Sequence, residues 1–327
     1  MPNVEPFNFQ NNRGTQNIGK SFQDILKKRP QMRNEYEKIR QIMLEDAEIK
    51  NFIQEHQPDL SEAIFNRDLA TIYEYYLQNK KQQDGLPDVH PGYDPELLFV
   101  DKRVVIQYRA SQKMQKQHEK LRAASKIMAI GMPKQLKSAT MNDFKSMDSG
   151  MTAAVLAVSE FIEDYVDRPQ EFHQGAYLQG PYGVGKTYLM GAMANQLSFD
   201  DIDVLLLHYP TLATNMKDAI SDHSIDTKTV RSDMKLVDIL VLDDIGAESD
   251  GSGWIRDDVL SVVLDYRMQN GLATFFTSNF SMKQLEEEHF TLTKNGAEPV
   301  KAARIMQRIK YLAKEIPVNG QNRRLNP

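Results

Sequence analysis

The sequence predicts two unlike parts: a mostly helical N-terminal domain with a short β-hairpin, then an α/β domain with a mainly parallel sheet. Apolar residues recur at helical spacing over much of the first half. From about residue 150 onward, short apolar runs alternate with helical stretches, which is typical of parallel strands joined by helices. One strand-to-helix connection there is the glycine-rich stretch GPYGVGKT at residues 180–187.

The N-terminal half begins with a polar stretch and continues with helical periodicity. Residues 1–17, rich in Asn and Gln, are expected to form a loose tail. Apolar spacing predicts helix over residues 18–56, and Pro30 should divide this region into two helices. Ser61 is placed to cap a further helix over residues 62–81.

Turn signals set the expected domain boundaries. Two strands around an Asp-Lys turn are predicted at residues 96–111, followed by a basic helix at residues 112–130. Residues 131–149 have turn residues and little periodicity, so we expect them to link the domains. The N-terminal domain is thus placed at residues 18–130 and the α/β domain at residues 150–327, which should end in a helix and a short strand.

Composition excludes several classes of site. The 327 residues include no cysteine, which rules out disulfides, thiol nucleophiles and zinc or iron–sulfur sites with cysteine ligands. No run approaches the roughly 18 apolar residues of a membrane span, and the N-terminus lacks the apolar region of a signal peptide, so a cytoplasmic protein without membrane contact is expected. The net charge of −5 means that DNA binding would need a local basic patch.

The stretch at residues 180–187 has the spacing of a phosphate-binding loop. Glycines allow a tight turn close to phosphate, and the following helix directs its N–H groups at the same place. Lys186 is expected to reach the β- and γ-phosphates, and Thr187 to bind Mg²⁺ through its hydroxyl. The residues expected to bind nucleotide are Gly180, Pro181, Tyr182, Gly183, Val184, Gly185, Lys186, Thr187 and Tyr188.

Two carboxylates follow a second apolar run, at residues 239–242. Adjacent charges at the end of a buried strand are costly without a cation, and beside a phosphate loop that cation would be Mg²⁺. Asp243 is expected to bind the metal, mostly through water, and Asp244 to orient or deprotonate a hydrolytic water. The alternative is a strand-end pair that caps the next helix.

A third apolar run, ATFFTSN at residues 273–279, ends in polar residues. Asn279 is expected to hold the water or the γ-phosphate, with Ser278 or Thr277 as weaker alternatives. Asn at the end of a strand is usually only a turn former, so its position after the other two elements carries the hypothesis.

Arginines in the C-terminal segment are candidates to stabilise charge on the γ-phosphate, from the same or a neighbouring subunit. Arg304 and Arg308 lie four residues apart, on one face of the predicted helix. Arg323 and Arg324 follow near the end of the chain. The alternative for any one of them is a solvated surface position.

These motifs in this order resemble the AAA+ domain of bacterial replicative-helicase loaders, the DnaI/DnaC family, and more distantly transposition-helper ATPases of the IstB kind. The resemblance runs from about residue 130 to the end. It implies an AAA+ P-loop ATPase in which Arg308 is a trans-acting arginine finger and Arg323 or Arg324 senses the γ-phosphate. Asp244 stands where many AAA+ proteins have Glu, and its shorter side chain predicts slow hydrolysis.

The N-terminal half also resembles the DnaI family, through the stretch PGYDPELLFVDKRVVIQY. That family often holds zinc here with cysteines and one His. His90 stands at the His position, but polar residues such as Asn79 and Gln82 occupy the neighbourhood of the missing cysteines. Because one His cannot hold a structural zinc, we expect no zinc, an ordinary turn residue at His90, and a small domain held by apolar packing alone.

The resemblance implies a primosome component that uses ATP and Mg²⁺ to load the hexameric replicative helicase onto single-stranded DNA, alongside other primosome proteins and with self-association in the assembled state. Helicase docking is expected in the N-terminal domain, with Phe22, Ile25 and Leu26 able either to enter a partner groove or to complete the domain core. Candidates for DNA contact, equally explained as solvated faces, are Lys217, Lys228, Arg231 and Lys235, and the basic helix with Lys113, Lys116, Lys120, Arg122 and Lys126.

Two other functions fit parts of the sequence. A transposition helper would share the ATPase domain but lack the PGYDPELLFVDKRVVIQY region. A small-molecule kinase would need a lid and an acceptor pocket, and nothing after Asn279 predicts either. A loader and a transposition helper would differ in their partner protein. A kinase would differ from both because it transfers phosphate to an acceptor molecule and not to water.

Overall fold

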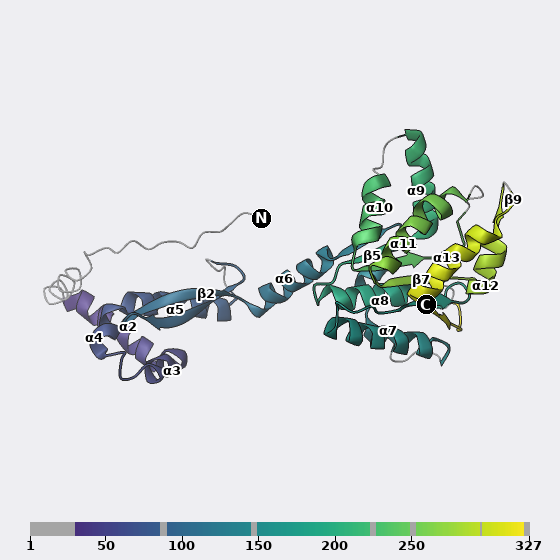
Figure 1. Ribbon diagram of the computed structural model, residues 1–327. Coiled ribbons are helices and arrows are strands. Elements are labelled where there is room, and N and C mark those ends of the chain that lie inside the picture. The colour runs from purple at the N-terminus through teal and green to yellow at the C-terminus, as the bar shows by residue number, and fades with distance from the viewer. Residues whose placement is uncertain are drawn as a thin grey trace. The chain divides into compact units, whose positions relative to one another are not determined.

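The computed structural model describes residues 30–85, 90–144, 149–222, 227–248, 253–294 and 296–323, and Figure 1 shows its elements. The chain divides into two compact units, residues 1–117 and residues 118–327. The expected tail at residues 1–17 and the candidate docking residues Phe22, Ile25 and Leu26 lie outside the described residues.

The first unit packs helices against a hairpin. Its buried core contains Met43, Ile49, Phe65, Ile72 and Leu97, contributed by both helices and strands. Its elements are α2 (Pro30–Glu45), α3 (Ala47–Glu55), α4 (Glu62–Arg67), α5 (Leu69–Gln83), β1 (Tyr93–Val100) and β2 (Arg103–Ala110). The prediction of a mostly helical domain with a short hairpin is confirmed.

Local chemistry explains where these elements begin and end. Pro30 is the first residue of α2, where a missing N–H costs nothing. Ser61 caps α4 as predicted, accepting a hydrogen bond from the Ile64 N–H. The single helix expected over residues 62–81 is instead broken at Asp68, whose carboxylate accepts a hydrogen bond of 2.9 Å from Val104 N on the hairpin. The hairpin turn has left-handed φ at both Asp101 and Lys102 (51° and 59°), as a two-residue turn requires.

The expectation that apolar packing alone holds this unit is wrong. Gln78 is buried and accepts a hydrogen bond of 2.6 Å from the Tyr108 hydroxyl, while Tyr75 donates one of 2.6 Å to Glu48. These bonds connect α5 with the hairpin and with α3. His90 lies in a turn, as expected: its carbonyl accepts from Tyr93 N at 3.1 Å, and its ring lies 4.3 Å from that of Tyr108.

The second unit is built on a six-stranded sheet in the order β10-β4-β7-β6-β5-β3, and every neighbouring pair is parallel. The strands are β3 (Ile127–Ile130), β4 (Gly175–Gln179), β5 (Val204–His208), β6 (Ile239–Asp243), β7 (Thr274–Ser278) and β10 (Ala313–Pro317). The order is not sequential, because β7 and β6 lie between β4 and β5. The prediction of an α/β domain with a mainly parallel sheet is confirmed.

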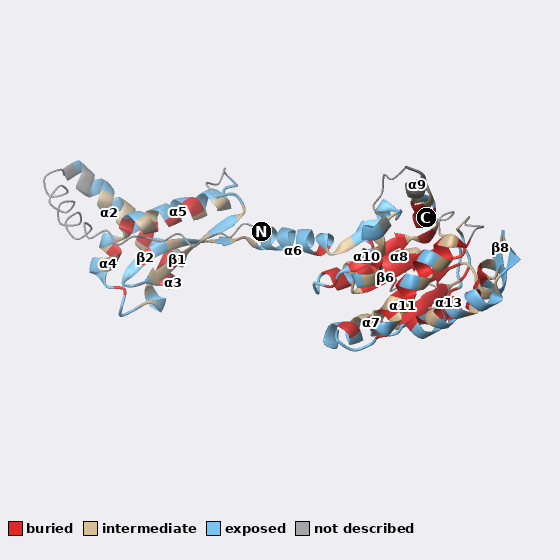
Figure 2. Ribbon diagram, turned by 45° about the horizontal axis from the view of Figure 1, so that its top comes forward, coloured by how far each residue is buried: buried red, intermediate tan, exposed pale blue. Residues whose placement is uncertain are grey.

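Helices cover both faces of this sheet, so its central strands are buried throughout, as Figure 2 shows in red. Along β6, Leu240 and Leu242 belong to one core, and Ile239 and Val241 to the core on the other face. The second core includes residues of α7 (Ser149–Asp167) and α8 (Lys186–Ser198). The first includes residues of α9 (Tyr209–Asp222), α10 (Thr227–Leu236), α11 (Ser261–Gln269) and α13 (Pro299–Leu312).

Short elements complete the second unit. The π-helical turn η3 (Ile255–Leu260) leads into α11, and α12 (Met282–Gln284) continues into a second π-helical turn, η4 (Leu285–Phe290). A small hairpin of β8 (Leu292–Thr293) and β9 (Gly296–Ala297) precedes α13. The chain then ends in a helix and a strand, α13 and β10, as predicted.

The border between the two units lies earlier than residue 130. The helix expected over residues 112–130 ends at Ser125 as α6 (Gln112–Ser125), and residues 127–130 form β3, the edge strand paired with β5. Residues 127–130 pair with β5 along their backbone, and Ile127 and Ile130 are half-buried in the sheet while Met128 and Ala129 stay exposed.

The expected linker at residues 131–149 is also packed on the second unit. Its helical turns η1 (Lys134–Ser138) and η2 (Met141–Phe144) place Leu136 and Phe144 among buried residues. The Asn195 amide of α8 donates hydrogen bonds of 2.8 Å to the carbonyls of Leu136 and Ala139. Across the described ranges, no helix is long and apolar enough to cross a membrane.

Candidate nucleotide-binding site

The phosphate loop joins the carboxyl end of β4 to the start of α8. Gly180 N donates a hydrogen bond of 3.2 Å to Ser278 O, which ties the loop to the neighbouring strand β7. Gly183 (φ 78°) and Gly185 (φ 109°) have left-handed backbone conformations that other residues rarely adopt. Because α8 starts at Lys186, its first N–H groups face the loop and favour an anion there.

Lys186 is buried and lies where the loop meets β7. Its ammonium group donates to Gly180 O at 2.7 Å, Pro181 O at 2.9 Å and Asn279 Oδ1 at 3.0 Å. A buried cation surrounded by carbonyl oxygens attracts negatively charged phosphate oxygens strongly. The phosphate contact of Lys186 stays a prediction.

Thr187 and Asp243 meet at the base of the loop. The Thr187 hydroxyl donates a hydrogen bond of 2.7 Å to Asp243 Oδ1, and the same oxygen accepts one of 2.6 Å from the Thr277 hydroxyl. Burial raises the pKa of Asp243, although both hydroxyls act in the opposite direction. A divalent cation would favour the ionised form of this buried carboxyl.

The donor set fits Mg²⁺. In the described part of the chain, no group of three or more His, Asp or Glu side chains could hold a metal ion by itself. Magnesium in nucleotide sites needs only one or two protein oxygens, since phosphates and water complete its octahedron. The Thr187 hydroxyl and the Asp243 carboxylate supply such oxygens side by side.

Asp244 is directed away from the strand by its backbone. Its φ of 60° is unusual for a residue other than glycine, and its N–H donates a hydrogen bond of 2.9 Å to the Thr277 hydroxyl. Its carboxylate accepts a hydrogen bond of 2.7 Å from Asn279 Nδ2. The segment that follows is a turn at residues 244–246, so this pair caps no helix there.

His208 is a neighbour of Asp244 that sequence reasoning missed. Its Nε2 lies 3.9 Å from Asp244 Oδ2, and its Nδ1 shares a hydrogen bond of 2.8 Å with the Thr211 hydroxyl. His208 ends β5 and pairs in register with Asp243. The signal was available in the sequence: a polar residue after the apolar run of β5, at the same sheet edge as the other strand-end residues.

Asn279 connects the two halves of the site. Its carbonyl accepts from Lys186 and its amide nitrogen donates to Asp244. The weaker alternatives have other roles, because Thr277 bonds to Asp243 and Ser278 donates a hydrogen bond of 2.7 Å to Ile245 O, with both side chains buried. Asn279 is thus the strand-end residue placed between the phosphate loop and Asp244.

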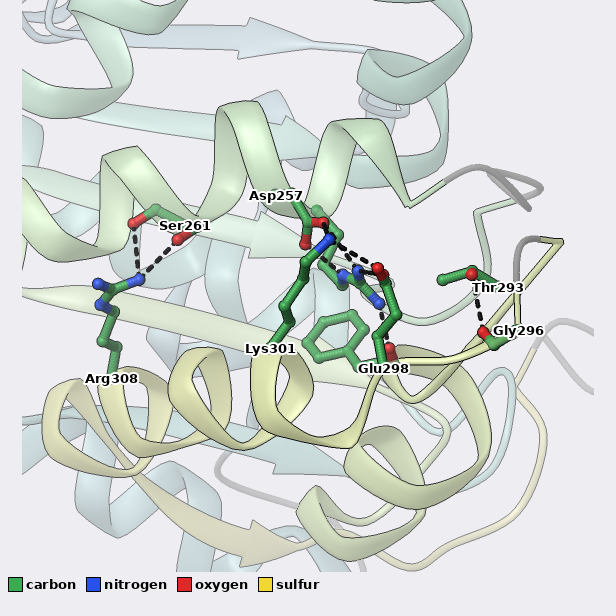
Figure 3. A network of polar contacts seen from close by, with 9 residues as sticks. Asp257, Ser261, Thr293, Gly296, Glu298, Lys301 and Arg308 are labelled. Atoms are coloured by element: carbon green, nitrogen blue, oxygen red, sulfur yellow. Dashed lines mark hydrogen bonds and ion pairs between the residues drawn. The ribbon is translucent and has the colours of Figure 1, made fainter.

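Arg308 lies elsewhere, in a groove of about 500 Å³ between α13 and α11, shown in Figure 3. It donates to the Ser261 hydroxyl at 2.6 Å and pairs with Asp265 at 2.9 Å. Arg304 is exposed and lines the same groove. Farther along the groove, Lys301, on the same helix as Arg308, bridges Asp257 and Glu298 at 3.0 and 2.6 Å.

The structure therefore groups most of the predicted site residues but not all. Lys186, Thr187, Asp243, Asp244 and Asn279 are joined by hydrogen bonds, whereas the bonds of Arg308 run to α11. The backbone N–H of Arg323 donates a hydrogen bond of 3.0 Å to Gly183 O, so the end of the chain returns to the loop. Arg324 lies outside the described residues.

The basic residues considered for DNA contact are distributed over three helices. Lys217 lies on α9, and Lys228, Arg231 and Lys235 on α10. Arg231 donates a long hydrogen bond of 3.5 Å to Asp258 O, and the Lys235 ammonium lies 5.7 Å from the Tyr266 ring centre. Around α6, Arg122 and Lys126 form ion pairs with Asp201 and Asp203, at 3.1 and 3.4 Å. DNA contact through any of these residues stays a prediction.

Two protein-family models match this chain. Residues 15–108 match the family model "Primosomal protein DnaI N-terminus", and residues 98–327 match the model "IstB-like ATP binding protein". The chain is 31% identical over 313 residues to the replicative helicase loader DnaI of Bacillus subtilis, and the alignment covers 94% of this chain and 98% of that protein. The chain belongs to the DnaI family.

Solved structures agree with this DnaI assignment. A crystal structure of DnaI is 40% identical, with a TM-score of 0.54, and covers 62% of this chain and 99% of its own. A putative primosome component from Streptococcus pyogenes serotype M3 is 34% identical, with a TM-score of 0.50, and covers 64% of this chain and 99% of its own. The chain thus belongs to the DnaI family, and its second region matches an ATP-binding model. Both findings favour nucleotide binding at the site around Lys186.

Proposed function

We propose that this protein is an ATP-dependent loader that places the replicative DNA helicase on single-stranded DNA, as a cytoplasmic component of the primosome. One combination of features supports this proposal most directly. The chain has a DnaI-type N-terminal region together with a candidate nucleotide site whose residues are joined by hydrogen bonds. The likeness to the B. subtilis loader over nearly the whole chain supports the same assignment.

In the proposed reaction the protein hydrolyses ATP. Lys186 holds the β- and γ-phosphates, and the N–H groups of residues 183–187 bind phosphate oxygens. Thr187 and Asp243 would hold Mg²⁺, and a bound Mg²⁺ would neutralise charge on the phosphates. Asp244 orients the attacking water and accepts its proton, while Asn279 fixes the Asp244 carboxylate and faces the γ-phosphate beside Lys186.

The rate of this reaction should be low. Asp244 has one methylene fewer than the Glu found in many AAA+ proteins, so its carboxylate lies farther from the water. The Asp244 backbone has an unusual φ of 60°, and its carboxylate is held by Asn279. Slow turnover suits a loader, which changes state once for each loading event.

Arg308 and Arg323 complete the proposal. Arg308 lies in a groove away from Lys186, which is consistent with a finger that acts on the nucleotide of a neighbouring subunit. The backbone of Arg323 is bonded to Gly183 in the phosphate loop, and its side chain would contact the γ-phosphate bound in the same subunit. Self-association in the assembled state is part of this proposal.

The two units divide the work in our proposal. The unit that ends at residue 117 docks on the helicase hexamer, and the unit from residue 118 binds ATP and single-stranded DNA. The transposition-helper alternative is supported by the IstB-like match of residues 98–327. It leaves the DnaI-type match of residues 15–108 without a role, so we favour the loader.

A loading assay tests the proposal. The replicative helicase of the same organism is mixed with circular single-stranded DNA, ATP and this protein, and DNA-bound helicase is measured after gel filtration. The proposal predicts that bound helicase rises with the intact protein and not with Lys186→Ala. Equal helicase loading with and without this protein would contradict the proposal and favour a transposase as partner.

A further inference from the structure

The segment after β10 runs along the phosphate loop. Val318 N donates a hydrogen bond of 2.7 Å to Gln179 O, just before the loop begins. Asn319 N donates one of 3.1 Å to Gly150 O at the start of α7. Arg323 N donates one of 3.0 Å to Gly183 O inside the loop. The first and last residues of the segment 318–323 are therefore bonded to Gln179, just before the loop, and to Gly183, in the middle of it.

The Asn322 side chain lies against the loop at Gly183. A methyl group built on Gly183 would lie 2.1 Å from Asn322 Oδ1 and 2.9 Å from Asn322 Nδ2. No larger residue fits at position 183 while Asn322 stays in place. The left-handed φ of 78° favours glycine in the middle of the loop, and a larger residue there would also displace the Asn322 side chain.

The bond from Arg323 fixes the direction of a peptide plane. In a trans peptide the C=O and the next N–H point in opposite directions. Because Gly183 O is held by Arg323 N on one side, the N–H of Val184 is directed to the opposite side. The bond from Arg323 therefore restrains the orientation of the Val184 N–H, and N–H groups are the donors that such loops offer to phosphate.

We propose that residues 318–323 form part of the nucleotide site, and that Asn322 and the Arg323 N–H are positioning groups that hold the phosphate loop ready for a nucleoside triphosphate. The proposal rests on the ATP-binding function proposed above and goes beyond it. Arg323 would then act through its backbone as well as through its guanidinium, and the two actions can be separated.

The first test compares two substitutions at one position. Arg323→Ala removes the side chain but keeps the N–H, whereas Arg323→Pro removes both. Dissociation constants for Mg²⁺–ATP are measured on the full chain by isothermal titration calorimetry. Loss of the bond to Gly183 should weaken ATP binding by Arg323→Pro about tenfold relative to Arg323→Ala. Equal affinities of the two variants would overturn the proposal.

The second test uses Asn322→Ala, with Gln321→Ala as a matched control at an exposed position of the same segment. We expect Asn322→Ala to raise KM for ATP about three- to tenfold with kcat unchanged, because the loop must be ordered before phosphate binds. The thermal midpoint of both variants should stay that of the parent. A KM equal to that of Gln321→Ala, or a fall in kcat alone, would overturn the positioning role.

The outcomes separate this proposal from the ATP-binding proposal. If the parent protein and Arg323→Ala bind ATP and Arg323→Pro binds equally well, ATP binding stands and the tail has no positioning role. If the parent protein does not bind ATP, both proposals are contradicted together.

Discussion

Asn279 donates a hydrogen bond of 2.7 Å from its amide nitrogen to the Asp244 carboxylate. The two residues directly follow different strands, β7 and β6, which neighbour each other in the sheet. The other end of the Asn279 amide accepts from the Lys186 ammonium at 3.0 Å. One side chain thus bonds both to the cation proposed to bind phosphate and to the proposed base.

Replacing Asn279 should therefore impair the chemical step more than binding. In Asn279→Ala the Asp244 carboxylate loses its fixed partner, and we expect kcat for ATP hydrolysis to fall about 100-fold. The matched control is Asn270→Ala, which removes an amide bonded only to its own helix, at Tyr266 O. Steady-state phosphate release measures both variants. A fall in affinity for ATP with kcat unchanged would contradict the proposed role.

Lys186 tests the nucleotide site itself. Lys186→Ala removes a buried ammonium group that the site supplies to the β- and γ-phosphates, so the dissociation constant for ATP should rise about 100-fold. Titration calorimetry gives the value, with Lys314→Ala, on the exposed side of β10, as the control. Unchanged affinity in Lys186→Ala would mean that this loop does not bind phosphate.

Asp243 links metal binding to stability. Burial raises the pKa of Asp243, so its neutral form stabilises the fold, and this contribution is lost as pH rises through that pKa. Asp243→Asn stays neutral and can still accept hydrogen bonds from Thr187 and Thr277. Without Mg²⁺ at pH 7, we expect its free energy of unfolding to exceed that of the parent by about 1 kcal/mol.

The advantage of Asp243→Asn should shrink as pH falls, because the parent carboxyl then takes up its own proton. Urea unfolding at several pH values measures this dependence. Affinity for Mg²⁺–ATP should fall in the same variant, since a charged metal ligand is lost. A variant that is less stable than the parent at pH 7, with Mg²⁺–ATP affinity unchanged, would show that Asp243 is a structural residue only.

Arg308 tests whether the ATPase works as an assembly. Arg308→Ala should leave ATP affinity unchanged and lower turnover in the assembled state about 1000-fold, because the finger stabilises charge only in the transition state. The control is Lys310→Ala on the same helix, which removes an exposed ion pair with Glu286. An equal loss of turnover in dilute, monomeric protein would assign Arg308 a role within its own subunit.

The sheet and the core of the site could be predicted because they depend on local patterns. The apolar runs that became β4 to β7 are buried on both faces, and strand-end polar residues of a parallel sheet meet at one edge. Lys186, Asp243 and Asn279 were therefore identifiable from order and spacing. The contact of Asp244 with His208 followed the same rule but needed the register of β5 with β6.

Other features depend on contacts between distant residues and have no local signal. The local sequence of β3 predicts the end of a basic helix. Its strand conformation depends on pairing with β5, which is distant in the sequence. Arg267 is fully buried and donates to the carbonyls of Val237 and Ala273 at 2.7 and 2.6 Å, yet its sequence neighbourhood is that of a surface helix. The return of residues 318–323 to the phosphate loop is likewise visible only in the folded chain.

In the proposed function, the N-terminal unit brings an ATPase to the replicative helicase. Native mass spectrometry of the full chain mixed with the helicase of the same organism, with and without ATP, tests this directly. The loader account predicts a discrete complex of defined stoichiometry, which disappears when residues 1–117 are removed. No complex under either nucleotide condition would contradict the account.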